Sequence, residues 1–197
     1  MRPTGQGGRA AGGPSLVYLV RHAEAELPGD ARRFVGQLDV PLSAAGVEQA
    51  RRLADRLRSI GFDAIYSSTL RRCLLTAQIV AEASGLPVQE ESGLREIDTG
   101  LWTGLTFEEA KELHPEEHRE REDDLVGRRF PGGESFLDLQ RRAVPALLAI
   151  SRAGGRNIFV VSHKGVNRVL LSHFRSLPLQ QMFSIPQDYC SVETIQL

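Results

Sequence analysis

The sequence is poor in cysteine, since only Cys73 and Cys190 occur among its 197 residues and they lie far apart. Two isolated cysteines exclude a disulfide framework and a CxxC metal site. Chains with so few cysteines suit a reducing compartment, so we expect a cytoplasmic protein.

Long apolar runs and net charge are also lacking. No stretch approaches the roughly 20 apolar residues that span a bilayer, so we expect no membrane contact. The formal net charge of −1 gives no electrostatic reason to expect nucleic acid as a partner. The first residues, MRPTGQGGRAAGGP, have no apolar segment of the kind found in secretory signals. Their composition predicts a flexible tail over 1–14, followed by a single domain over 15–197.

What the sequence does contain is an alternation of apolar runs and amphipathic stretches. The runs SLVYLV, FDAIYSS, LPVQEE, NIFVVSH and SVETIQL are typical of strands. Helices are expected over 43–60, 69–85, 106–113, 135–155 and 165–174. Ser43 is an N-cap candidate, Gly85 a C-cap, Thr106 with Glu109 a capping box, and Pro145 a point of kinking. This alternation predicts an α/β fold with a mainly parallel central sheet and helices on both faces.

Polar residues follow three of the predicted strands. Arg21-His22 follows LVYLV, Ser162-His163 follows NIFVV, and Arg71-Arg72 comes shortly after FDAIYSS. The carboxyl ends of parallel strands meet at one edge of a sheet, where ligands bind in open α/β folds. Arginines, histidines and helix N-termini gathered at such an edge predict a site for a phosphate dianion.

Four segments resemble, in order, the motifs of the histidine phosphatase superfamily, also called phosphoglycerate-mutase-like. They are LVRHAEA, YSSTLRRCLLTA, GLREIDTGLWTG and VVSHKGVNR, with FVGQLDVPLSAAGVEQA and PGGESF as further family-like segments. The resemblance covers residues 16–197 and implies that family's three-layer sandwich.

The resemblance also implies roles for five residues. His22 would be the nucleophile, because a neutral imidazole can attack phosphorus with one nitrogen while the other is held by a hydrogen bond. Arg21 and Arg72 would clamp the phosphoryl oxygens and His163 would donate a further contact. Glu96 would protonate the leaving alcohol and then activate water. Neither a metal nor a cofactor is expected, because side chains supply the positive charge.

Three more residues are candidates for contact with the substrate: Gly36, Gln37 and Lys164. Lys164 stands after His163, where a small residue is common in the family, and could add a cation to the rim of the pocket. Ala23 replaces the glycine of the commonest RHG motif, a small change that should leave the nucleophile working. Arg71 is expected on the surface, since the family spacing from Ser67-Ser68 selects Arg72.

The leading hypothesis is therefore a metal-independent phosphomonoester hydrolase acting through phosphohistidine on a small phosphorylated metabolite. The α-ribazole-5'-phosphate phosphatase group is the nearest resemblance, which makes that ester one candidate substrate. A cofactor-dependent phosphoglycerate mutase is the alternative. The acidic segment between Trp102 and Phe130 is interpreted as a lid that disfavours highly anionic substrates, which favours hydrolysis over transfer. Exposed helix and strand edges leave room for a homodimer, although nothing in the sequence requires one.

Two other classes of function are weighed against this hypothesis. HPEEH, from His114 to His118, fits a zinc peptidase pattern, but its strongly charged surroundings are typical of a solvated helix face. A binding module without turnover would keep the fold and lose the chemistry. Cys73 is expected in the core and His173 in a structural or exposed position.

Overall fold

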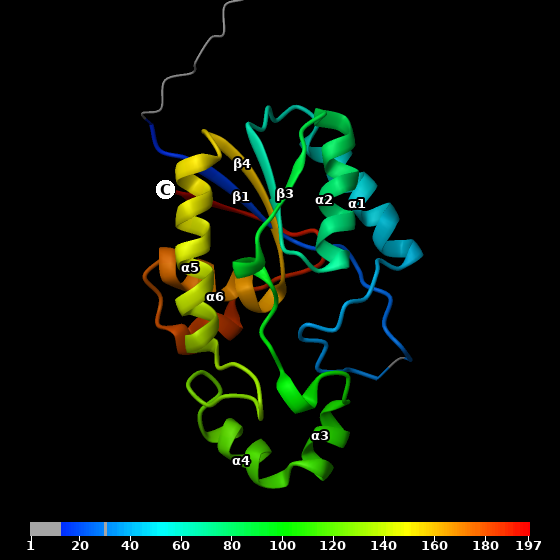
Figure 1. Cartoon of the computed structure of the whole chain (residues 1–197), viewed down its shortest axis with the longest axis vertical. Coiled ribbons are helices and arrows are strands. Elements are labelled where there is room, and N and C mark those ends of the chain that lie inside the picture. Colours follow the sequence, from blue (N-terminus) through cyan, green and yellow to red (C-terminus); the bar gives the residue numbers. More distant parts are fainter. Residues whose placement is uncertain (1–12, 30) are drawn as a thin grey trace, which may run out of the picture.

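The computed structural model describes residues 13–29 and 31–197. Its centre is a five-stranded sheet in the order β3-β2-β4-β1-β5 (Figure 1). The strands are β1 (Leu16–Arg21), β2 (Ala64–Ser67), β3 (Val88–Glu90), β4 (Asn157–Ser162) and β5 (Val192–Gln196). The pairs β1–β4, β2–β4 and β2–β3 are parallel, and β5 runs antiparallel to β1. The predicted sheet is therefore confirmed, whereas the predicted tail lies outside the described residues as far as residue 12.

Helices cover both faces of this sheet, as predicted. The pair α1 (Ala44–Leu57) and α2 (Arg71–Ser84) lies on one face, and α5 (Phe136–Ala153) and α6 (Lys164–Phe174) lie on the other (Figure 1). Successive residues of β4 pack on opposite faces of the sheet. Phe159 belongs to the hydrophobic cluster that contains residues of α1 and α2, and Val160 belongs to the cluster that contains residues of α5 and α6. Since both strand faces are buried, the parallel strands appear in the sequence as continuous apolar runs.

The helix boundaries follow the local sequence. Ser43 caps α1 by accepting a hydrogen bond from the Gly46 amide, and Gly85 ends α2 in the left-handed region at φ 69°. Thr106 and Glu109 form the predicted capping box at the start of α3 (Phe107–Leu113). The helix α5 continues through Pro145 to Ala153.

The chain between β3 and α5 lies beyond the carboxyl edge of the sheet. It contains the short 3₁₀ helices η1 (Ser92–Leu94) and η2 (Gly100–Trp102), followed by α3 and α4 (Pro115–Asp123) at the bottom of Figure 1. A third 3₁₀ helix, η3 (Leu179–Ser184), follows α6. Within the part of the chain that the structure describes, no helix is both long and apolar enough to cross a membrane.

The register of the sheet sets the position of the strand ends. Arg21 of β1 lies opposite Ser162 of β4. The His22 amide continues this pairing by donating to the Ser162 carbonyl at 3.0 Å, and the Ser68 amide donates to the Val161 carbonyl at 2.9 Å. The three strand ends therefore meet at one edge, as the sequence predicts.

Candidate active site

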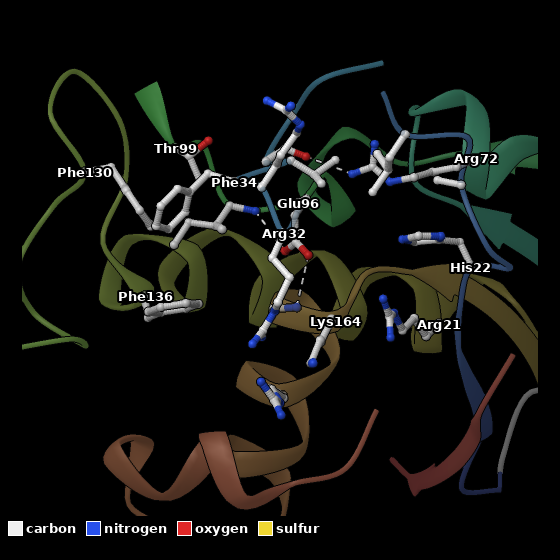
Figure 2. Close-up of a pocket in the computed structure, with 18 of the residues that line it drawn as sticks. Arg21, His22, Arg32, Phe34, Arg72, Glu96, Thr99, Phe130, Phe136 and Lys164 are labelled. Carbon is white, nitrogen blue, oxygen red and sulfur yellow. Dashed lines mark hydrogen bonds between the residues drawn. The ribbon is translucent and has the colours of Figure 1, made fainter. Parts of the chain in front are cut away.

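A cavity of about 400 Å³ opens at this edge of the sheet (Figure 2). Six predicted site residues line it, namely Arg21 and His22 at the end of β1, Gly36 in the loop before α1, Arg72 at the start of α2, Glu96 after η1, and Lys164 at the start of α6. Figure 2 shows the His22 imidazole between the guanidinium groups of Arg72 and Arg21. Elements distant in the sequence thus deliver these groups to one pocket.

The geometry around His22 determines which ring nitrogen can react. Its side chain is buried, with 6% of the residue exposed, and Nδ1 lies 2.7 Å from the carbonyl oxygen of Ala23. A carbonyl can only accept, so Nδ1 carries the hydrogen and Nε2 keeps the free lone pair. Burial, followed by the charge of Arg72, holds the pKa of His22 well below its ordinary value of 6.5. The imidazole is therefore neutral near pH 7.

Arg72 is almost completely buried, with 1% of the residue exposed. Its two Nη atoms donate to the carbonyls of Leu38 at 2.7 Å and Gly36 at 2.8 Å. Its Nε has no hydrogen-bond partner within the described part of the chain. Three of its five N–H donors therefore remain for a ligand. Arg71, by contrast, is exposed as predicted.

Residues near the C-terminus of the chain hold the Arg21 side chain. Its Nη1 donates to the Gln187 carbonyl at 2.6 Å, and its guanidinium lies 3.9 Å from the centre of the Tyr189 ring. Such cation–π stacking orients a guanidinium without neutralising it. Because burial of an uncompensated cation is costly, the pair formed by Arg21 and Arg72 favours an anion in the cavity.

His163 is completely buried beside His22, with the two ring centres 5.2 Å apart. Its Nε2 lies 2.8 Å from Ser68 Oγ and 3.3 Å from Cys73 Sγ. Burial, followed by the charge of Arg72, keeps its pKa well below 6.5. His163 does not belong to the residues that line the cavity, so its direct contact with phosphate stays a prediction. Cys73 is in the core as expected, and burial raises the pKa of its thiol.

The Glu96 carboxylate is fixed by two backbone amides. Oε1 accepts from its neighbour Ile97 at 3.0 Å, and Oε2 accepts from Gly165, in the first turn of α6, at 3.1 Å. Figure 2 places this carboxylate across the cavity from His22. A carboxyl group so placed can exchange a proton with a leaving group or with water.

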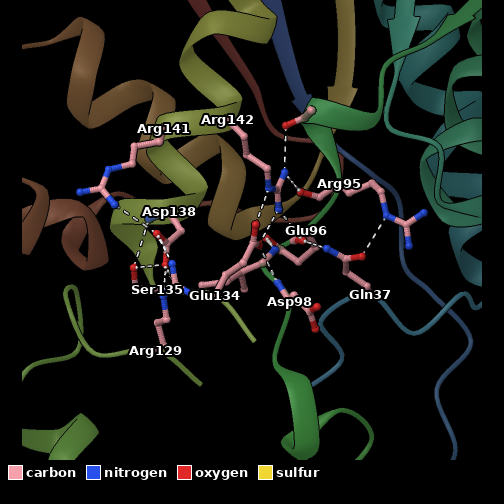
Figure 3. A network of polar contacts seen from close by, with 12 residues as sticks. Gln37, Arg95, Glu96, Asp98, Arg129, Glu134, Ser135, Asp138, Arg141 and Arg142 are labelled. Atoms are coloured by element: carbon pink, nitrogen blue, oxygen red, sulfur yellow. Dashed lines mark hydrogen bonds and ion pairs between the residues drawn. The ribbon is translucent and has the colours of Figure 1, made fainter. Parts of the chain in front are cut away.

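Arg142 of α5 supports the backbone around Glu96 (Figure 3). It donates to the carbonyls of Gly93, Arg95 and Glu96 at 2.9, 2.7 and 2.9 Å. Its other partner is the Glu134 carboxylate, which it meets through two hydrogen bonds of 2.7 and 2.8 Å. This bidentate pair anchors the loop to the helix. Sequence reasoning missed Arg142, because nothing in its helix distinguishes it from the exposed arginine before it.

Gly36 lines the cavity as predicted, and Gln37 does not. Gly36 has φ +44°, and a β-carbon there would collide with Thr99 Oγ1. The Gln37 amide donates to the Glu96 carbonyl at 3.0 Å and accepts from Arg95 Nε at 3.0 Å (Figure 3). Gln37 therefore supports the Glu96 loop, and its contact with a substrate stays a prediction.

The predicted acidic lid needs a correction. The acidic side chains of α3 and α4 do not line the cavity, and Phe107 is the only residue of these two helices that does. The charged residues of the described lining are Arg21, Arg32, Arg33, Arg72, Lys164 and Arg168, with Glu96 as the single acid. The prediction was wrong because the net charge of a segment does not tell which face it turns to the pocket. The site attracts anions instead of repelling them.

Sequence reasoning also missed one wall of the cavity and the lining residue Arg168. The wall is aromatic, formed by Phe34, Phe107, Phe130, Phe136 and Phe183. Arg168 follows Lys164 by one helical turn in α6, a spacing that could have found it. The aromatic residues come from separate loops and helices, and no spacing in the sequence connects them.

The two histidines of HPEEH lie beside Trp102. The ring centre of His118 lies 5.7 Å from that of Trp102, and that of His114 lies 6.3 Å from it. His118 Nδ1 is 3.6 Å from Glu122 Oε2. No group of three or more side chains suited to hold a metal occurs among residues 13–29 and 31–197.

The fold and the pocket together define an α/β enzyme site for phosphate esters. Residues 17–197 match the sequence profile of the histidine phosphatase superfamily (branch 1), and the chain belongs to this family. The predicted family is thereby confirmed, and similar proteins that are named as phosphatases confirm the predicted enzyme class.

The individual proteins that this chain resembles are named for different substrates. The chain is 36% identical over 182 residues to phosphoserine phosphatase 1 of Hydrogenobacter thermophilus, covering 92% of this chain and 86% of that protein. It is 37% identical over 184 residues to 6-phosphofructo-2-kinase/fructose-2,6-bisphosphatase 1 of Rattus norvegicus, covering 92% of this chain but only 36% of that longer protein. The structure of the α-ribazole phosphatase from Shigella flexneri has a TM-score of 0.83 at 27% identity, covering 91% of this chain and 89% of that chain.

Proposed function

We propose that this protein is a metal-independent phosphomonoester hydrolase that acts through a phosphohistidine at His22. One observation carries the proposal. The Ala23 carbonyl holds Nδ1 of His22, so that the lone pair of Nε2 is free in a cavity lined by Arg21 and Arg72. These arginines supply the positive charge that stabilises the phosphoryl oxygens in the transition state.

The proposed reaction has two steps. Nε2 of His22 forms a bond to phosphorus while the ester P–O bond breaks, and the departing oxygen takes a proton from the Glu96 carboxyl group. Water then attacks the phosphorus, gives a proton to the Glu96 carboxylate, and displaces the histidine. The N–P bond breaks with its electron pair returning to Nε2, and inorganic phosphate leaves. The enzyme ends in its starting state.

The first prediction concerns the nucleophile. His22→Ala should lower kcat for 4-nitrophenyl phosphate by at least about 10⁴-fold, because the covalent route is lost. Wild-type protein quenched during turnover should carry acid-labile phosphate, and the variant should carry none. His173→Ala is the matched control, since His173 is an exposed histidine on α6. Equal labelling of wild type and His22→Ala would refute the mechanism.

Two more specific functions each have a supporting observation. The similarity to the α-ribazole phosphatase and the aromatic wall of the cavity support a phosphorylated nucleoside, α-ribazole 5'-phosphate, as one candidate. The cations that line the cavity favour a second candidate, a phosphoglycerate mutase activity. Rapid formation of 2-phosphoglycerate from 3-phosphoglycerate with trace bisphosphoglycerate would establish transfer over hydrolysis.

We also propose a cytoplasmic location, which the two free cysteines support.

A further inference from the structure

Four cations line the cavity besides Arg21 and Arg72, and one of them, Arg33, is paired with Glu109 at 3.7 Å. The other three, Arg32, Lys164 and Arg168, line the same cavity as His22. Figure 2 shows Arg32 and Lys164 between the His22 end and the wall formed by Phe130 and Phe136. A phosphate held at His22 would therefore leave these three cations facing the rest of the substrate.

Arg168 of this cluster is fixed by the segment that follows α6. Lys164 and Arg168 lie one turn apart on α6. Arg168 donates from Nε to the Ile185 carbonyl at 2.9 Å and from Nη2 to the Phe183 carbonyl at 3.1 Å. The Arg168 guanidinium is thus held in place by neutral backbone atoms.

No acid among the described residues forms an ion pair with the cluster. Within the described part of the chain, none of the three cations forms an ion pair, and the one acid in the cavity lining, Glu96, is engaged by backbone amides. Burial, followed by the charges of Arg168, Arg21 and Arg32, lowers the pKa of Lys164, and the charge of Asp188 opposes this shift without reversing it. Like charges held together without a counter-ion are unfavourable, so this part of the cavity is preorganised for an anion.

We propose that the leaving alcohol of the natural substrate carries a second anionic group, a carboxylate or a phosphate, bound by Lys164, Arg168 and Arg32. The inference rests on the proposed function, because it assumes that the ester phosphate occupies the His22 end. A nucleoside monophosphate such as α-ribazole 5'-phosphate has no second anion and would leave the cluster unmatched. The inference therefore ranks doubly anionic esters above that candidate.

The second prediction tests this inference by competition. Inhibition constants against 4-nitrophenyl phosphate hydrolysis are measured for 3-phosphoglycerate and glycerol 3-phosphate, which differ by a carboxylate in place of a hydroxymethyl group. A second pair, fructose 1,6-bisphosphate and fructose 6-phosphate, tests a phosphate in the same place. At least one doubly anionic member should bind about 10- to 100-fold more tightly than its partner, as charge-assisted hydrogen bonds predict.

Lys164→Met should lower this preference about tenfold. Lys111→Met is the matched control, since Lys111 is the only other lysine of the chain and lies exposed on α3. The inference is overturned if neither pair shows a preference, or if the preference survives in Lys164→Met. Failure of the proposed function would look different, because 4-nitrophenyl phosphate would then not be hydrolysed and no phosphohistidine would form.

Discussion

At the scale of single residues, the site depends on backbone groups as much as on side chains. The Ala23 carbonyl sets the tautomer of His22, and the amides of Ile97 and Gly165 hold the Glu96 carboxylate. A backbone carbonyl is present whatever the side chain, so alanine at position 23 can replace the glycine that is common there without changing this contact.

Gly165 offers a test of how Glu96 is held. A β-carbon at Gly165 would lie 2.5 Å from Glu96 Oε1, which is the end of a flexible side chain. We therefore expect Gly165→Ala to displace the carboxylate and lower kcat by about 10²-fold, within the range assigned to a general acid. The melting temperature should change little, because alanine also favours the helix.

The control for Gly165→Ala is Gly61→Ala, where a β-carbon would meet no other atom within 4 Å. Steady-state kinetics and thermal denaturation of both variants provide the comparison. Unchanged kcat in Gly165→Ala would show that the position of Glu96 does not limit turnover.

At the scale of elements, α5 and the loop before η2 form one unit. The ion pair between Arg142 and Glu134 is three-quarters buried. Burial alone would raise the pKa of Glu134, but hydrogen bonds from Arg142 and the Asp98 amide outweigh it and lower the pKa. The pair therefore contributes to stability and also fixes the backbone that carries Glu96.

We expect Arg142→Met to lower the free energy of unfolding by about 1–3 kcal/mol, since three carbonyls and a partly buried carboxylate lose their donor. It should also lower kcat, because the Glu96 backbone is released. Arg141→Met is the matched control, since Arg141 is the preceding residue of α5 and its side chain is 75% exposed. Urea denaturation and kinetics of both variants check the prediction, and equal effects of the two substitutions would contradict it.

The elements also show what a sequence can and cannot predict here. Strands, helix caps and the strand-end residues were predictable, because periodicity and capping act over a few residues and the parallel sheet brings the strand ends together. The supporting position of Gln37 and the aromatic wall were not, because irregular loops take their shape from contacts with distant parts of the chain. The stacking of Tyr189 on Arg21 was unpredictable for the same reason.

At the scale of the whole molecule, the two buried histidines couple folding to pH. Their pKa values lie well below 6.5 in the folded protein and return to about 6.5 in the unfolded chain. Below pH 6.5 the unfolded chain therefore binds more protons than the folded protein, whereas above it the contribution to stability is fully present.

We therefore expect the free energy of unfolding to fall as the pH is lowered from about 7.5 to about 5.5, by up to about 1.4 kcal/mol per pH unit for each histidine. Denaturant unfolding at several pH values measures this slope. His22→Gln should reduce it by the share of one proton, whereas His173→Gln, at an exposed site, should not. A free energy that does not change over this range would contradict the prediction.

The position of β1 and β4 within the sheet has a consequence for how long the pocket survives thermal motion. Both strands have neighbours on either side, and Arg21 and Ser162 lie opposite each other where they end. Fraying enters a sheet from its outer strands, so an interior pair separates only when the molecule as a whole unfolds. We therefore expect the nucleophile, at the end of β1, to lie beside one of the last parts of the protein to open, so that local opening of the helices beyond the sheet edge leaves the strand pair intact.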